Sequence, residues 1–210
     1  MTNLLNQYLT EMSRIAQAHG ATVGKYIGDA ILAFFGDPVS RGLQKDATAC
    51  VRMAIAMQQR MRELRQIWQD RALEKPFELR VGITTGYCTV GNFGSEDRLD
   101  YTVIGNAVNL AARLQTLAER GAILLDSETH SLVKDTIKTS ERGAIAVKGL
   151  SRPVHVHAVE GIYAEDDVSG RVISLQRDGL RLLIECDKLS GGAKAEAINV
   201  LTAALKRLQE

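Results

Sequence analysis

The chain has 210 residues, with 26 lysines and arginines against 25 aspartates and glutamates, so its formal net charge at pH 7 is +1. A hydrophobic content of 45% and a charged content of 24% are typical of a globular chain with its own core, which excludes a disordered or fibrous protein. The balanced charge argues against nucleic-acid binding through phosphates, and no apolar run approaches the ~20 residues that span a bilayer.

The cysteines and the N-terminal segment indicate the compartment. Cys50, Cys88 and Cys186 are odd in number and lack the spacing of a metal site, which favours buried or free thiols in a reducing environment. The first residues have neither the basic nor the apolar region of a signal peptide. We therefore expect a soluble, cytoplasmic chain, whose parent protein could still be attached to a membrane through segments outside this sequence.

The first part of the chain predicts two helices on either side of a hairpin. Two apolar runs that meet at Gly28-Asp29 predict the paired strands. The elements expected here cover, in chain order, residues 2–19, 22–27, 30–35, 43–68 and 77–91. Apolar residues at helical spacing predict a buried stripe on the second helix, formed by Ala47, Val51, Ala54, Met57, Met61, Leu64 and Trp68.

The second part alternates helices and strands. The polar excursion over 91–99 does not look like a phosphate-binding loop and predicts a protruding hairpin that pairs two chains. A helix, a buried strand, a small helix and two strands are then expected over residues 106–118, 122–125, 127–135, 144–148 and 153–159. This alternation without internal repeats indicates an α/β or α+β sandwich.

The composition changes after about residue 163, where a polar linker begins. A hairpin that turns at Asp178-Gly179 and a helix over 193–209 follow. This segment is too small to form a domain of its own. We therefore predict a main domain over 1–162 and an appendage of linker, hairpin and helix over 163–210.

Lys25 and Asp29 are candidate site residues in the predicted hairpin. Asp29 follows Gly28, which allows close approach of a ligand, and a rigidly held carboxylate suits Mg²⁺ whose shell is completed by phosphate oxygens. The spacing alone nevertheless favours an ordinary turn residue, because Gly-Asp tolerates turn dihedral angles. Lys25 taken alone is most simply a surface lysine, and the turn breaks the strand register, so the sequence does not place both residues in one site.

Asn109 and Arg113 lie four residues apart on a predicted helix and therefore share a face. An amide and a guanidinium presented together can hold a phosphate or a ribose, although an ordinary polar helix face explains the pattern as well. Lys148 fits either a phosphate ligand or a loop lysine. His155 and His157 share one face of a strand, and without a third ligand they favour a structural role over zinc binding.

Four segments occur in a characteristic order: K-Y-I-G-D-A-I-L-A-F-F-G, G-I-T-T-G-Y-C-T-V-G-N-F-G, D-Y-T-V-I-G-N-A-V-N-L-A-A-R-L and V-K-G-L-S-R-P-V. None is specific alone, but together they resemble the catalytic domain of class III nucleotidyl cyclases, most nearly bacterial adenylyl cyclases of the type related to soluble, bicarbonate-responsive cyclases. The resemblance covers about residues 2–160. It implies an α+β fold with a ferredoxin-like βαββαβ core, and a homodimer with composite active sites at its interface.

By motif position, the resemblance assigns metal binding and purine recognition. Asp29 matches one of two metal-binding aspartates, which implies two ions, Mg²⁺ or Mn²⁺, as cofactors. Lys25 and Thr102 match the pair that reads the purine. In the family, a dimer has two active sites, and this pair and the metal aspartates of the same chain belong to different ones. A lysine donates to adenine N1, whereas the protonated N1 of guanine requires an acceptor, and Thr102 can accept from the adenine amino group. The pair therefore favours ATP over GTP as substrate.

The remaining matches concern the ribose and the phosphates. Asn109 and Arg113 match the pair that orients the ribose and stabilises charge on the α-phosphoryl group, and Lys148 matches a lysine that binds the triphosphate. The implied activity is that of an adenylate cyclase in intracellular signalling: the ribose 3′-hydroxyl attacks the α-phosphorus, pyrophosphate leaves and cyclic AMP forms. Two metal ions would activate that hydroxyl and neutralise the phosphates.

The sequence departs from the family at its start. The family's domain begins with a strand that carries the other metal aspartate in a motif of the form F-x-D-I-x-G-F-T, and this sequence has no such segment. Asp29 is then the only assigned metal carboxylate, and the sheet lacks an interior strand. Three explanations stay open: a truncated or misassigned start of an ordinary cyclase, which the retained site residues favour; a poorly folded fragment; or a catalytically deficient module that forms a heterodimer with an intact cyclase and regulates or complements it.

Overall fold

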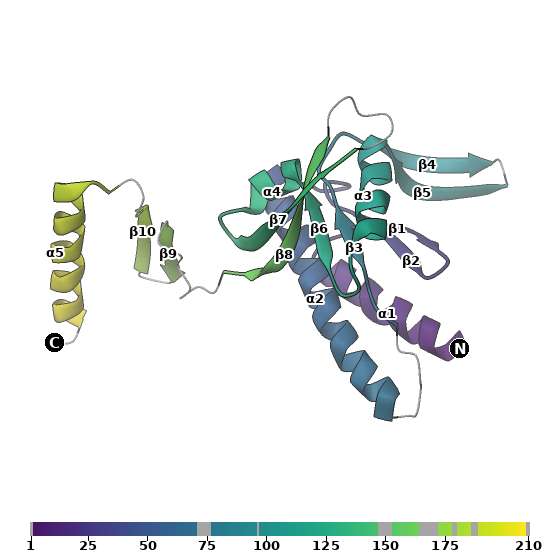
Figure 1. The fold of residues 1–210 in the computed structure, drawn as a ribbon, viewed down its shortest axis with the longest axis horizontal. Coiled ribbons are helices and arrows are strands. Elements are labelled where there is room, and N and C mark those ends of the chain that lie inside the picture. Colours follow the sequence, from purple (N-terminus) through teal and green to yellow (C-terminus); the bar gives the residue numbers. More distant parts are fainter. Residues whose placement is uncertain are drawn as a thin grey trace. The chain divides into compact units, whose positions relative to one another are not determined.

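The computed structural model describes residues 2–70, 77–95, 97–146, 153–163, 172–177, 180–185 and 189–208. The chain divides into two compact units, Met1–Ile162 and Tyr163–Glu210. The first unit has a mixed α+β architecture, as the sequence predicts (Figure 1). Its elements are α1 (Thr2–Ala18), β1 (Thr22–Ile27), β2 (Ala30–Phe34), α2 (Leu43–Asp70), β3 (Val81–Ile83), β4 (Thr89–Ser95), β5 (Arg98–Ile104), α3 (Asn106–Leu117), β6 (Ile123–Asp126), α4 (Ser127–Val133), β7 (Ile137–Ile145) and β8 (Val154–Ile162).

Among the described residues, the strands of the first unit form one four-stranded sheet and two hairpins. The sheet has the order β3-β6-β8-β7, in which β3 and β6 run parallel and the other neighbours run antiparallel. The hairpins are β1–β2 and β4–β5. The second hairpin extends away from the body of the unit in Figure 1, so the protruding hairpin expected near residues 91–99 is confirmed, while its role in pairing chains stays a prediction.

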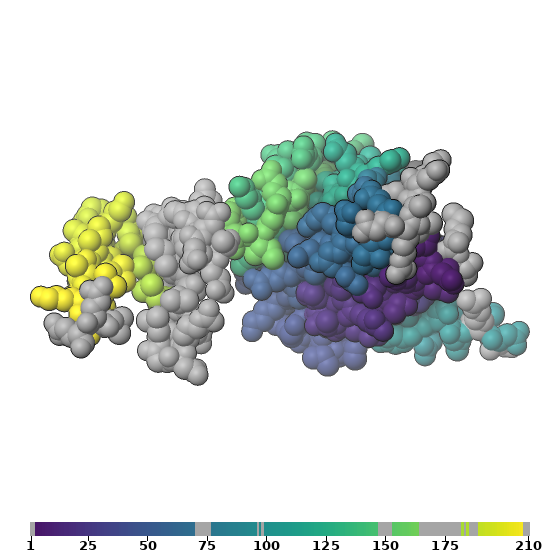
Figure 2. Space-filling model, turned by 90° about the horizontal axis from the view of Figure 1, so that it is seen from below, coloured from purple at the N-terminus to yellow at the C-terminus, as the bar shows by residue number. Residues whose placement is uncertain are grey.

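The core beneath the first hairpin is formed by α1 and α2, which lie side by side on one face of the unit (Figure 2). Every residue of the predicted stripe on the second helix is buried. The indole N–H of Trp68 donates to Oε1 of Gln7 at 3.0 Å, and Arg60 forms an ion pair with Glu11 at 2.9 Å. The amphipathic pattern of the two helices thus becomes one apolar interface with polar contacts across its margin.

The strand predicted over 77–91 is wrong, because the structure has two separate strands in this region. The backbone between β3 and β4 leaves the strand pairing at Thr84 and Thr85. The Thr84 hydroxyl donates to the carbonyl oxygen of Ala107 at 2.8 Å, and the hydroxyls of Thr85 and Thr129 are 2.9 Å apart. Side-chain hydrogen bonds to residues distant in the sequence thus hold the segment that follows β3, and local sequence does not reveal them.

The strand predicted over 144–148 is also misplaced. The observed strand, β7, covers Ile137–Ile145, and residues 147–148 lie outside the described residues. Its pairing with β8 is irregular between Glu141 and Ala144, and a bulge of this kind shifts the alternation of inward and outward side chains. The polar residues around the bulge hide the strand from a pattern-based prediction.

The second unit contains a hairpin and a helix, as expected. The strands β9 (Val172–Arg177) and β10 (Leu180–Glu185) pair antiparallel, and α5 covers Gly191–Leu208. The turn predicted at Asp178-Gly179 lies outside the described residues. In neither unit does a described helix combine the length and the hydropathy needed to cross a membrane.

The cysteines fit the sequence prediction in the described part of the chain. Cys50 and Cys88 are both free thiols, and burial raises the pKa of Cys50 to about 12. A thiol with so high a pKa stays protonated at neutral pH and is unreactive. Cys186 lies outside the described residues.

Candidate active site

The first hairpin presents its side chains on two faces, and a bulge at Gly24 decides which residue faces which way. Val23 pairs with Ala33, but the next pair is Lys25 with Leu32, so Gly24 is an extra residue in β1. Residues directly opposite in an antiparallel pair share a face. Lys25 therefore shares the face of Leu32, whereas Val23 lies with Ala33 on the opposite face.

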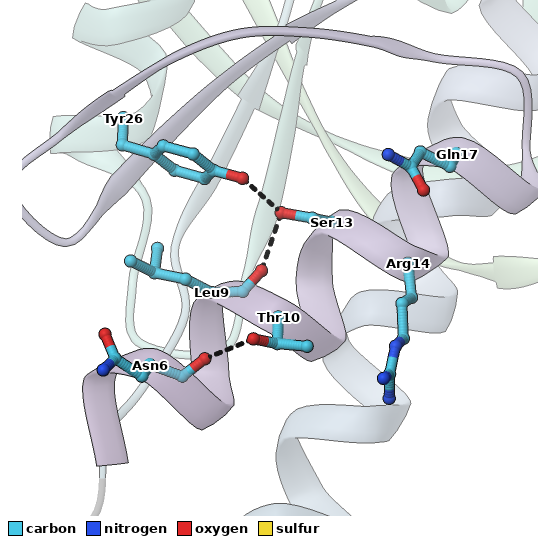
Figure 3. A pocket seen from close by; sticks show the side chains of 7 residues that line it. All are labelled: Asn6, Leu9, Thr10, Ser13, Arg14, Gln17 and Tyr26. Atoms are coloured by element: carbon cyan, nitrogen blue, oxygen red, sulfur yellow. Dashed lines mark hydrogen bonds between the residues drawn. The ribbon is translucent and has the colours of Figure 1, made fainter. Parts of the chain in front are cut away.

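The face opposite to Lys25 packs on α1. Val23, Ile31 and Ala33 contact the apolar cluster that α1 forms with α2. The Tyr26 hydroxyl lies 2.8 Å from the hydroxyl of Ser13 in α1, which places Tyr26 on the same side (Figure 3). Lys25, half-buried, consequently faces away from α1.

Thr102 lies against this second face of the hairpin. A β-carbon built on Gly24 would be 3.1 Å from Oγ1 of Thr102, so β1 and β5 are in direct contact there. Thr102 is only 2% exposed, and its hydroxyl has no hydrogen-bond partner among the described residues. A buried hydroxyl without a partner carries a desolvation penalty, which a bound polar group would remove. The structure thus brings Lys25 and Thr102 onto adjoining strands, beside an unsatisfied polar atom.

Asn109 and Arg113 lie on α3, which follows β5 after a single residue, Gly105. A β-carbon on Gly105 would be 3.0 Å from Sγ of Cys88 and 3.1 Å from the carbonyl oxygen of Tyr87, so the backbone passes too close to these residues for a side chain. Both Asn109 and Arg113 are exposed and lie one helical turn apart on the same face. An amide and a guanidinium are thereby presented to solvent from a rigid helix.

Asp29 lies at the turn between β1 and β2 and is exposed. Burial raises the pKa of Tyr8 to about 12, and the negative charge of Asp29 adds to this effect. The carboxylate of Asp29 therefore lies within electrostatic range of a buried residue of α1. Because Mg²⁺ is commonly bound by one or two carboxylates together with substrate phosphates, an exposed carboxylate on a rigid turn fits a share in such a site.

Lys148, the sixth candidate residue, lies outside the described residues. The remaining five fall on three positions of the first unit: the hairpin β1–β2 with Lys25 and Asp29, the strand β5 with Thr102, and the helix α3 with Asn109 and Arg113.

A contact between Asp37, which follows β2, and Tyr101 of β5 was not predicted from the sequence. The Tyr101 hydroxyl donates to the carboxylate of Asp37, and this hydrogen bond raises the pKa of Tyr101. The Thr22 hydroxyl donates to the carbonyl oxygen of Asp37 at 2.7 Å. The segment after β2 is thereby tied to both β1 and β5. The separation of Asp37 from Tyr101 in the sequence leaves no local signal for this contact.

Three histidines form a cluster with Glu141 of β7: His130 on α4, and His155 and His157 on β8. Nδ1 of His155 lies 2.9 Å from a carboxylate oxygen of Glu141, and the rings of His130 and His157 stack with centroids 3.9 Å apart. Among the described residues, no three histidine, cysteine or acidic side chains are arranged to hold a metal ion. The structural role of His155 and His157 stays a prediction.

A depression of about 390 Å³ lies between α1 and β1 (Figure 3). Among the residues that line this depression, Arg14 is the one with a charged side chain, and none is a candidate site residue. The lining residues are Asn6, Leu9, Thr10, Ser13, Arg14, Gln17 and Tyr26. The depression is thus separate from the constellation described above.

Comparisons with known proteins identify the family to which the chain belongs. Residues 1–161 match the family described as the adenylate and guanylate cyclase catalytic domain. Adenylate cyclase 1 of Rhizobium meliloti (strain 1021) is 29% identical over 161 residues, which cover 76% of this chain and 24% of that protein. The chain spans about a quarter of the length of the curated relatives it matches.

Two solved structures are similar in both sequence and fold. The adenylyl cyclase CyaB from P. aeruginosa is 52% identical with a TM-score of 0.75, and the match covers 80% of this chain and 85% of that chain. The guanylyl cyclase Cya2 is 35% identical with a TM-score of 0.71, and the match covers 77% of this chain and 80% of that chain.

Proposed function

The chain belongs to the family of adenylate and guanylate cyclase catalytic domains, and from this premise we propose that it converts ATP into 3′,5′-cyclic AMP and pyrophosphate. In this reaction the ribose 3′-oxygen forms a bond to the α-phosphorus and the bond from that phosphorus to the bridging oxygen of pyrophosphate breaks. The proton of the 3′-hydroxyl passes to solvent, and the electron pair of the broken bond leaves with pyrophosphate. Because similar structures include an adenylyl and a guanylyl cyclase, the choice of ATP rests on the residues of this chain.

The observation that carries this choice is the buried, unpartnered hydroxyl of Thr102 beside the strand of Lys25. Lys25 faces the side of the hairpin on which Thr102 lies. An ammonium donates to adenine N1, and a threonine hydroxyl accepts from the adenine amino group. Guanine presents a donor at N1 and a carbonyl oxygen at C6. Its N1–H would therefore face the ammonium of Lys25, which is also a donor.

Asn109 and Arg113 are proposed to act on the ribose and the α-phosphoryl group. Both side chains are exposed on one face of α3 and are free to reach a ligand in front of that helix. The amide of Asn109 would orient the ribose for attack in line with the leaving group. The guanidinium of Arg113 would hold the α-phosphoryl oxygens as they gain charge in the transition state.

Asp29 is proposed to bind the divalent ions, Mg²⁺ or Mn²⁺. Such ions, when bound, neutralise the phosphates and lower the pKa of the attacking hydroxyl. The exposed carboxylate of Asp29 fits this role, since substrate phosphates complete the shell. Lys148 is proposed to bind the triphosphate.

We also propose that the active site is formed between two chains. Lys25 faces away from α1, whereas the charge of Asp29 acts on Tyr8 within α1. A single nucleotide beside Lys25 and Thr102 of one chain is therefore better reached by Asp29 of a second chain. A homodimer would form two such sites.

The test is production of cyclic AMP and cyclic GMP by the 210-residue chain with Mn²⁺ and each triphosphate. We expect cyclic AMP as the main product. As a control, a chain with Arg113→Ala, prepared in the same way, should yield far less product. Cyclic GMP as the main product would overturn the assignment of the Lys25 and Thr102 pair.

A second candidate function is a module that completes the site of another cyclase. It is considered because Asp29 is the one carboxylate that the motif matches assign to the metal, whereas the resemblance implies two. In this candidate the chain contributes Lys25, Thr102, Asn109, Arg113 and Lys148, while its partner contributes the metal carboxylates.

Complementation distinguishes the two candidates. A homologous cyclase that lacks the arginine matching Arg113 should be inactive alone and regain activity when this chain is added. Activity that appears only in the mixture supports the second candidate, and activity of this chain alone supports the first.

A further inference from the structure

We propose that Gly24 is a positioning residue that sets the preference for adenine, because it keeps the Thr102 hydroxyl in place and turns Lys25 toward it. This inference rests on the proposed function. Gly24 makes no polar contact with a ligand itself. It acts through its missing side chain and through its place in the strand pairing.

The first argument is steric. A β-carbon on Gly24 would lie 3.1 Å from Oγ1 of Thr102 and 3.2 Å from Cε1 of Phe34. Both distances are shorter than an ordinary van der Waals contact to carbon. Neither atom ends a long flexible chain, so a methyl group here would displace the Thr102 hydroxyl or the Phe34 ring by a few tenths of an ångström. The backbone of Gly24 does not have a positive φ, so backbone conformation does not explain the glycine.

The second argument is the strand register. In a regular strand, Lys25 would share the face of Val23, two residues before it, and would point into the core formed with α1. The extra residue at Gly24 shifts the alternation, so Lys25 pairs with Leu32 on the other face. Gly24 itself would direct a side chain toward Phe34 and Thr102, on that same face. The bulge thus makes Lys25 and Thr102 neighbours on one side of the hairpin.

The third argument is the space around the Thr102 hydroxyl. Thr102 pairs with Gly91 in the β4–β5 hairpin, and a β-carbon on Gly91 would meet only Cε2 of Phe93, at 3.9 Å. Glycines therefore stand on both sides of Thr102, one in β1 and one in β4. The hydroxyl between them is buried and unpartnered among the described residues. The oxygen is closed off from solvent, and the exocyclic amino group of a purine would supply the hydrogen bond that it lacks.

The experiment compares wild type with Gly24→Ala, Thr102→Ala and the double variant. Gly161→Ala serves as the matched control, because Gly161 is also in a strand, has no positive φ and has nothing within 4 Å of the position that a β-carbon would occupy. For each chain, kcat and KM are measured with Mn²⁺ and ATP or GTP, and equilibrium affinities for ATP and GTP analogues are measured alongside. Thermal unfolding of all chains reports on folding.

A weakened hydrogen bond is worth about 0.5–1.5 kcal/mol, so Gly24→Ala should lower the preference for ATP over GTP by about 2- to 12-fold, mainly through KM. Gly161→Ala should leave the preference unchanged. In the Thr102→Ala background, Gly24→Ala should lower the preference no further, because the hydroxyl through which it acts is gone.

The outcomes separate this inference from the proposed function. If wild type prefers ATP and Gly24→Ala retains the same preference, the inference is wrong and the proposed function stands. Equal effects of Gly24→Ala in both backgrounds would likewise exclude a role through Thr102. If folded wild type neither binds nor cyclises either nucleotide, the proposed function fails and the inference falls with it.

Discussion

Gly82 of β3 and Ala111 of α3 pack backbone against backbone: a β-carbon on Gly82 would lie 2.2 Å from the carbonyl oxygen of Ala111 and 2.4 Å from the amide nitrogen of Gln115. The contact holds α3 against the edge strand of the four-stranded sheet. Since α3 also carries Asn109 and Arg113, the same contact fixes the position of two candidate site residues relative to the sheet.

The substitution Gly82→Ala should push α3 away from the sheet. Backbone atoms cannot yield as a flexible side chain does, so we expect destabilisation of about 3 kcal/mol or more, at the upper end of the range for overpacked cores. Urea unfolding measures this change. The control Gly161→Ala, in open space, should alter the free energy of unfolding by at most about 1 kcal/mol. Equal stability of the two variants would contradict the close packing of β3 and α3.

The substitution Arg113→Ala should lower kcat for cyclic AMP formation by about 100- to 1000-fold, the range found when one donor to a developing anion is removed. Arg113 is exposed, so the melting temperature should change little. Arg113→Lys should recover only part of the activity, because an ammonium lacks the two-pronged geometry of guanidinium. Arg52→Ala, at an exposed arginine of α2, is the control. Wild-type kcat in Arg113→Ala would rule out the proposed role.

The substitution Asp29→Asn should raise the Mn²⁺ concentration that gives half-maximal activity. Mutation of a residue that only hydrogen-bonds to a metal ligand lowers metal affinity about 10- to 100-fold. Removal of the charge of a ligand itself, as in Asp29→Asn, should lower the affinity at least as much. The exposed carboxyl is replaced by an amide of the same shape, so folding should be unaffected. Asp135→Asn, at an exposed turn after α4, is the matched control. An unchanged Mn²⁺ dependence would remove Asp29 from the metal site.

The histidine cluster should make the first unit less stable in mild acid. Burial lowers the pKa of His157, and the charges of His130 and His155 lower it further. The negative charge of Glu141 partly opposes this decrease. The unfolded chain, with an ordinary pKa of about 6.5, then binds a proton more readily than the folded chain. The contribution of His157 to stability is therefore fully present above about pH 6.5 and decreases as the pH falls through the lower, folded pKa.

Urea midpoints at pH 7.5 and 5.5 measure this effect. Glu141 acts in the same direction at lower pH, because its hydrogen bond to His155 lowers its pKa. His157→Gln should reduce the difference between the two midpoints, whereas His19→Gln, at the end of α1 and outside the cluster, should preserve it. A larger pH difference in His157→Gln would show that the sign is wrong.

Local patterns predicted most helices well and the strands unevenly. The stripe from Ala47 to Trp68 is buried as predicted, because one apolar face repeated over many turns admits few other solutions. The segments over 77–91 and 144–148 were assigned wrongly. In the first, Thr84 and Thr85 bond to residues distant in sequence, and in the second a bulge in β7 disrupts the alternation.

The sequence by itself determined the family of this protein, the α+β class and the residue types that could act on a nucleotide, because ordered motifs and helical periodicity are local properties of the chain. Only the tertiary structure decided that Lys25 lies on the side of the hairpin next to Thr102 rather than on the core side, because a single unpaired residue, Gly24, reverses the alternation of β1. The structure likewise disclosed the unpartnered hydroxyl of Thr102 and the tie between Asp37 and Tyr101. Such contacts depend on which distant backbone segments become neighbours, and residue order alone does not encode them in any short pattern.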